Sequence, residues 1–229
     1  MAGGGAYVLG RRERLWRRTR LGLLLSAVGL LVSWIPIVAV LGAIFLSVGS
    51  TFLFLGARAA GRKHEVAVVV AYLVLTVAGA IIGVLLSAFL LQAYDASQRG
   101  LPLSDLRGTA ALMLWASLPA SFALTAGLVL QVAFLVPRER WRLMSVLAAA
   151  LGVTATAATW LANADVAALG FAPVRASAIA DFLIRVSVYR ILEAPAYVGL
   201  ALLYFTEHWR AAAPILTPSP VAGPNPENG

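Results

Sequence analysis

The sequence predicts an all-α fold, a polytopic transmembrane helical bundle of about six spans, on the basis of three observations. Of 229 residues, 61% are hydrophobic and only 12% are charged, whereas soluble domains are about half apolar and about a quarter charged. The apolar residues form long uninterrupted runs, and the basic residues gather in short clusters between them. A soluble fold of this length would have too little charged surface to face water, so lipid must cover much of its outer face.

The first apolar run predicts two short spans rather than one long helix. A basic segment, residues 1–20, ends in RRERLWRRTR, and no charge follows from Leu21 to Ala57. A single helix over that run would rise about 55 Å, nearly twice the hydrocarbon thickness of a bilayer. Pro36 lies near the middle of the run, and proline disfavours helical geometry at the residue before it. We therefore expect spans at about 19–34 and 37–57, joined by a tight turn.

Four more spans complete the transmembrane domain, which we place at 21–209. Spans three to five are expected at about 66–93, 109–136 and 143–162, each bounded by polar breaks. The last helical stretch is different, because its first half is charged and its second half is apolar. It is expected to begin as an amphipathic segment at the outer interface and to cross the bilayer at about 189–208. The Pro-rich tail, 210–229, is expected to be disordered.

The basic residues predict the orientation. Six spans place the N-terminal segment, the breaks at 58–65 and 137–142, and Arg210 on one side, and this side holds most of the Arg residues and the only Lys. Loops with more Lys and Arg face the cytoplasm. A multi-pass protein of the cell membrane with both termini in the cytoplasm is therefore expected.

Several function classes are unsupported by the sequence. The chain has no Cys and only two His, so thiolate catalysis and Cys-ligated metals are excluded. Hydrolase, metalloprotease and phosphate-binding motifs are also missing, and no enzyme activity, cofactor or metal is expected. A nucleic-acid partner is not expected either, because the basic residues lie between apolar runs instead of covering a soluble face.

Small residues recur at helical spacing on several of the predicted spans. Gly79, Gly83 and Ser87 share one face of the third span, and Gly152 and Thr156 share one face of the fifth. Such faces let helix backbones approach closely, which makes helix packing the first interpretation. The alternative is that some of these faces line a hydrated path.

The last helical stretch contains the clearest candidate for a functional site. Arg190 and Glu193 are three residues apart, and Asp181 and Arg185 are four apart, so each pair can meet on one face. Ionisable side chains are costly inside a bilayer and therefore suggest a function. The hypothesis is an ion or proton site at Glu193, with Arg190 as its partner and Pro195 loosening the helix. The competing interpretation is an interfacial helix with paired charges.

Two functions remain open at this point. The first, which the sequence favours, is a non-enzymatic membrane subunit or scaffold that forms a homo-oligomer or binds a partner membrane protein. The second is a small permease or channel, including the membrane half of an ATP-driven transporter, with its site at Arg190 and Glu193. In either case the segment Arg11–Arg20 is expected to bind the anionic headgroups of the lipid bilayer.

Overall fold

The protein is an all-α helical bundle. The computed structural model describes residues 3–35 and 38–211. Within these ranges the chain forms no β-strand. The only β-bridge in them is an isolated antiparallel pairing of Pro102 with Pro173. The predicted fold class is therefore confirmed. The Pro-rich tail falls almost entirely on residues 212–229, which lie outside the described ranges.

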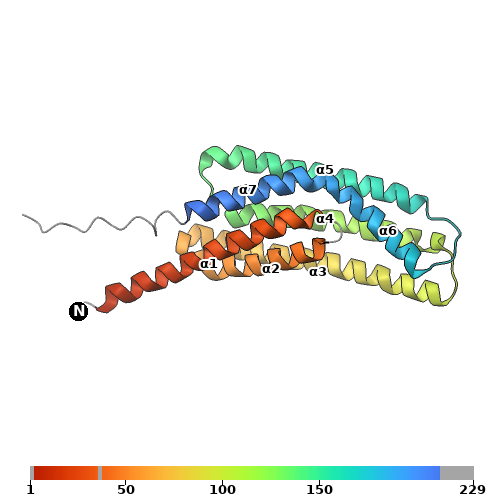
Figure 1. Ribbon diagram of the computed structural model, residues 1–229, viewed down its shortest axis with the longest axis horizontal. Coiled ribbons are helices and arrows are strands. Elements are labelled where there is room, and N and C mark those ends of the chain that lie inside the picture. Colours follow the sequence, from red (N-terminus) through yellow and green to blue (C-terminus); the bar gives the residue numbers. More distant parts are fainter. Residues whose placement is uncertain (1–2, 36–37, 212–229) are drawn as a thin grey trace, which may run out of the picture.

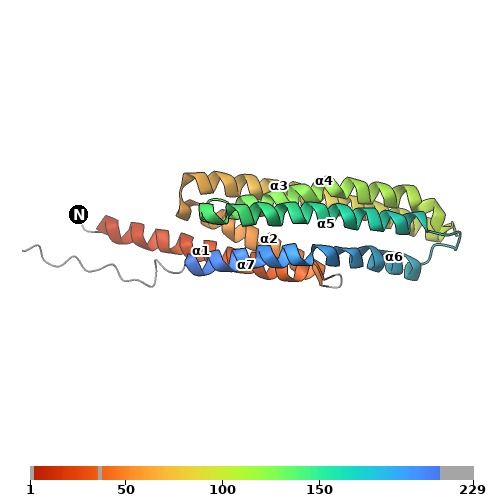
Figure 2. The same ribbon diagram turned by 90° about the horizontal axis from the view of Figure 1, so that it is seen from above.

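Seven α-helices form the bundle. Their bounds are α1 (Gly3–Ser33), α2 (Ala39–Gly56), α3 (Arg62–Gln98), α4 (Arg107–Val132), α5 (Trp141–Ala167), α6 (Ala176–Val188) and α7 (Ala194–Arg210). Figure 1 shows α3, α4 and α5 running the whole length of the bundle, with α1, α2 and α7 beside one half and α6 beside the other. Figure 2 shows α3, α4 and α5 in one layer and α1, α7 and α6 in a second.

Five helical stretches in the described residues are long and apolar enough to cross a membrane. They are Ala39–Ala60, Arg62–Gln98, Leu103–Val132, Arg138–Ala167 and Ala176–Arg210. The sixth expected span, 19–34, falls in α1, a single helix that also includes most of the basic N-terminal segment. The apolar part of α1, Leu21–Ser33, would rise only about 20 Å. This part packs against α2 as one arm of a hairpin.

The α1–α2 hairpin brings two helix backbones into direct contact. Glycines recur every seven residues on both arms of the hairpin: Gly22 and Gly29 on α1, and Gly42, Gly49 and Gly56 on α2. A Cβ atom added at any of them would lie 2.7–2.8 Å from a backbone nitrogen of the opposing helix. Thr19 fits the same contact by donating its Oγ1 hydrogen bond to the Gly56 carbonyl, 3.0 Å away. At these five positions, only glycine permits this approach.

A buried polar network joins three helices in the half of the bundle that holds the hairpin. Gln131 of α4 donates from Nε2 to Ser50 Oγ of α2 at 2.8 Å. The Tyr204 hydroxyl of α7 lies 3.0 Å from Gln131 Oε1 and 2.7 Å from the Leu128 carbonyl oxygen. Gln131 and Tyr204 are completely buried. Hydrogen bonds between helices therefore supplement apolar packing here.

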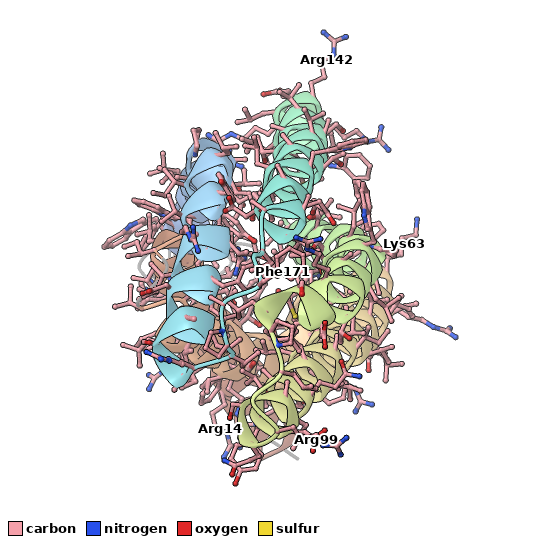
Figure 3. All side chains as sticks on the ribbon, turned by 90° about the vertical axis from the view of Figure 1, so that its right-hand side faces the viewer. Arg14, Lys63, Arg99, Arg142 and Phe171 are labelled. Atoms are coloured by element: carbon pink, nitrogen blue, oxygen red, sulfur yellow. The ribbon has the colours of Figure 1, made fainter. Side chains whose placement is uncertain are left out.

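The other half of the bundle has its own apolar core, and α6 is part of it. Phe182 of α6 is buried against Phe89 of α3, with ring centroids 5.8 Å apart. The expected amphipathic character of this segment is present, but its apolar face packs against protein. Figure 3 looks along the bundle from this end, with Phe171 in the loop between α5 and α6. That loop pairs with the α3–α4 loop through backbone hydrogen bonds, including Leu103 N to Ala172 O at 2.8 Å.

A buried carboxylate lies at the opposite end of the bundle. Glu207 of α7 is 4% exposed, and its Oε1 lies 3.6 Å from Arg210 Nη1 and 3.8 Å from Arg140 Nη1. A buried charge without a partner is costly.

We predict that the double variant Arg140→Gln/Arg210→Gln loses about 1–3 kcal/mol of stability in SDS unfolding. Adding Glu207→Gln should restore most of it, and a triple variant as unstable as the double one would refute this explanation.

Candidate functional site

The candidate site lies where the last helical stretch changes geometry. Tyr189–Glu193 forms a 3-10 turn between α6 and α7, and Arg190 and Glu193 both belong to it. Pro195 explains the change, because it has no N–H to donate to the Ile191 carbonyl and its ring crowds that turn. A 3-10 segment in the middle of a helix often marks a functional hinge. The sequence hypothesis that Pro195 loosens the helix next to these charges agrees with this geometry.

Arg190, Glu193 and Tyr197 form one cluster. Arg190 Nη2 lies 3.8 Å from Glu193 Oε2, beyond hydrogen-bond distance, and donates to the Tyr197 hydroxyl at 3.4 Å. The Glu193 side chain is 10% exposed and that of Arg190 is 43% exposed. The carboxylate therefore lies behind the guanidinium, which faces open space. Tyr197 was not identified from the sequence, although its position four residues after Glu193 places both on one helix face.

A cavity of about 190 Å³ with both apolar and polar lining residues opens in front of this cluster, mainly between α4 and α5. Five Ser and Thr residues contribute to its wall: Ser117, Ser121, Thr125, Thr159 and Ser187. Those of α4 and α5 donate to carbonyls of their own preceding turns, as Ser121 does to Ser117 at 3.1 Å. Their oxygens keep free acceptor lone pairs. The cavity can therefore accept hydrogen bonds from a solute or from water.

A second hollow, a groove of about 430 Å³ between α2 and α3, meets the cavity at the same place. Arg190 and Tyr197 line both hollows, together with Ile82, Leu124 and Leu128. Glu193 lines the cavity but not the groove. Among the described residues, Arg190 is thus the charged side chain that faces the groove. The two hollows converge on its guanidinium.

The other predicted charge pair does not join this cluster. Asp181 and Arg185 are both exposed on α6, and no ion pair joins them in the part of the chain that the structure describes. Neither lines the cavity or the groove. The structure therefore separates the four predicted residues into one interior pair, Arg190 with Glu193, and two surface charges.

The small-residue faces also separate into two kinds. Gly152 is in tight contact, since an added Cβ would lie 2.7 Å from the Phe122 ring, and Thr156 donates to its carbonyl at 2.8 Å. Gly79 and Gly83 have no atom within 4 Å of an added Cβ, and they are exposed, as is Ser87. Both glycines line the α2–α3 groove. The face on α3 thus borders open space in this chain instead of packing against another of its helices.

The described residues offer no cluster of three His, Cys, Asp or Glu side chains that could hold a metal ion. What the arrangement offers chemically is one guanidinium, one shielded carboxylate, a phenol and several hydroxyls around open space. These groups can bind a polar or anionic solute. No protein-family model, curated protein or solved structure matches this chain.

Proposed function

We propose that the protein is a small permease or channel that binds a polar or anionic solute at Arg190, Glu193 and Tyr197. The single observation behind this proposal is that a groove and a cavity with several hydroxyl groups in its wall are both lined by Arg190 inside an apolar bundle. A bundle that served only as a scaffold would gain nothing from a charged side chain left facing open space, since such a group is costly in a bilayer. The shielded Glu193 adds a titratable group at the same point.

Cysteine accessibility tests whether the cavity contains water. The chain has no native Cys, so Ser121→Cys places a single thiol in the cavity wall. We expect it to react with a charged, membrane-impermeant methanethiosulfonate, because only a hydrated thiol ionises and reacts. Reaction from both faces of membrane vesicles, measured by mass shift, would indicate a path through the bundle.

Val84→Cys is the matched control, because Val84 lies on the apolar outer surface of α3 and is 68% exposed. A thiol there should lie in lipid and stay unmodified. If Ser121→Cys is as unreactive as Val84→Cys, the cavity is dry and the permease proposal fails.

A second comparison uses proton flux in liposomes. Glu193→Gln should reduce the flux, and the exposed Asp181→Asn should not.

A subunit role is the second candidate, and the exposed face of Gly79, Gly83 and Ser87 is the observation that favours it. An exposed small-residue face can accept a helix of another protein. The native mass of the tagged protein after gentle solubilisation separates the two functions. A stoichiometric partner, including an ATPase, would favour the subunit or transporter-half role. A lone monomer would favour an independent permease.

We also propose that the protein lies in the cell membrane with both termini in the cytoplasm. The support is the clustering of basic residues at the end of the bundle where Arg58, Arg138 and Arg210 lie. Arg14, Arg17 and Arg18 of α1 are exposed there, where they can bind anionic headgroups. A reporter fused after residue 211 should be active only in the cytoplasm, and an external reporter signal would reverse the orientation.

A further inference from the structure

We propose that the solute of this site is a membrane phospholipid, which enters sideways from the bilayer with its phosphate at Arg190 and an acyl chain in the α2–α3 groove. This inference rests on the proposed function, because it names the class of molecule that the same site accepts. Three features of the described residues support it: the lateral opening of the groove, its size, and the charged side chain at its end.

The groove opens toward the surrounding lipid. Its two sides are made of small residues, with Ala43 and Ser47 on α2 and Gly79 and Gly83 on α3. All four are exposed, so no side chain of the described chain closes the gap between the two helices. A molecule in the bilayer can therefore reach the groove without passing through either aqueous face.

The groove has the dimensions and the lining of a ligand site for an amphiphile. Its volume of about 430 Å³ lies in the range of sites that hold small organic ligands. Leu46, Leu75 and Ile82 supply apolar wall, while Thr51 and Tyr72 supply a few polar groups. An acyl chain can lie against such a wall. A fully hydrated ion would gain little from it.

The charged group at the inner end of the groove is a guanidinium, which is paired at 3.8 Å with the Glu193 carboxylate behind it. Arg190 is the charged residue of the described chain that lines the groove, because Glu193 lies behind it. Its guanidinium has five N–H donors, and the one hydrogen bond found for it is the long contact to Tyr197. Guanidinium groups match the geometry of phosphate oxygens and bind them through two parallel hydrogen bonds. The remaining donors can bind a headgroup phosphate.

Photo-crosslinking tests this inference on the full-length protein in nanodiscs. The probe is phosphatidylglycerol with a diazirine in its acyl chain, and diacylglycerol with the same chains but no phosphate is the lipid control. We expect the phospholipid probe to label peptides from residues 43–51 and 76–83 preferentially. The diacylglycerol probe should label these peptides much less. Arg190→Gln should lower the labelling of these peptides about tenfold, the effect of losing a charge-assisted contact.

Two further variants keep the test valid if Arg190→Gln disturbs the fold. Gly83→Leu fills the groove at a position where an added Cβ meets nothing, so it should block labelling while the protein stays folded. Arg185→Gln and Val84→Leu are the matched surface controls, and both should label like the wild type.

Two outcomes would overturn the inference. Labelling spread evenly around the bundle, unchanged by Arg190→Gln and by Gly83→Leu, would show ordinary boundary lipid. If excess inorganic phosphate abolished the labelling, the site would bind free phosphate instead of a lipid. The cysteine-accessibility test can fail independently of the lipid test, because it reports only on water in the cavity between α4 and α5. A dry cavity together with specific lipid labelling would leave a lipid site and remove the permease.

Discussion

Replacing Gly49 with valine is expected to disrupt the α1–α2 hairpin and to destabilise the whole bundle strongly. A Cβ at this position would lie 2.7 Å from the backbone nitrogen of Ser26, in contact with the Ser26 hydroxyl, and 2.9 Å from the Gly22 carbonyl oxygen. Two of these neighbours are backbone atoms, which cannot move without separating the helices. Overpacking typically costs about 1–3 kcal/mol, and valine adds two methyl groups to the clash. We expect the cost to reach or exceed the upper end of that range.

The measurement is unfolding of the purified protein by SDS in mixed micelles, compared with the yield of monodisperse protein. Gly79→Val is the matched control, because it makes the same chemical change in an apolar helix where an added Cβ meets nothing within 4 Å. It should change stability by less than about 0.5 kcal/mol. Equal losses for the two variants would mean that helix propensity or insertion, and not the hairpin contact, sets the cost.

The fold was largely predictable because long apolar runs and basic clusters report directly on the bilayer. Pro36 correctly indicated that the first run is interrupted, and the structure has α1 end at Ser33 and α2 begin at Ala39. The boundary between the basic segment and the first span was harder to predict from the sequence. The bilayer constrains apolar length, but it does not stop a helix from including the basic residues Arg18 and Arg20, as α1 does.

Packing partners were harder to predict than helices. A Gly-x-x-x-Gly pattern shows that a helix backbone can be approached, but it does not say by what. Gly79 and Gly83 fit this pattern and border a groove, whereas Gly42, Gly49 and Gly56, spaced by seven, form the closest backbone contact in the hairpin. The spacing of seven was readable in the sequence, since it keeps residues on one face of two helices that wind around each other.

The candidate site was partly predictable for a similar reason. Arg190 and Glu193 stand out in sequence because charges are rare in spans. Tyr197 does not, since tyrosine is common near membrane interfaces, and only the folded chain shows it beside Arg190. The cavity itself depends on which faces of α4 and α5 meet, and small and hydroxylated residues occur on several faces of these helices.

Replacing Gln131 with leucine is the second change expected to have a large effect. The side chain is completely buried between Ser50 and Tyr204. Leucine would leave the Ser50 hydroxyl without its donor and remove an acceptor for Tyr204. Leaving buried polar groups unpaired costs about 1–3 kcal/mol in soluble proteins and somewhat less between membrane helices, so we expect a loss of about 1–2 kcal/mol in SDS unfolding.

A double-mutant cycle with Tyr204→Phe separates the network from simple loss of volume. Tyr204 also contacts the Leu128 carbonyl oxygen at 2.7 Å, so Tyr204→Phe alone should be destabilising. If the two side chains act together, the double variant should lose clearly less than the sum of the single losses. Gln98→Leu, which changes an exposed glutamine at the end of α3, should have little effect. Additive losses would mean that Gln131 and Tyr204 stabilise the bundle independently.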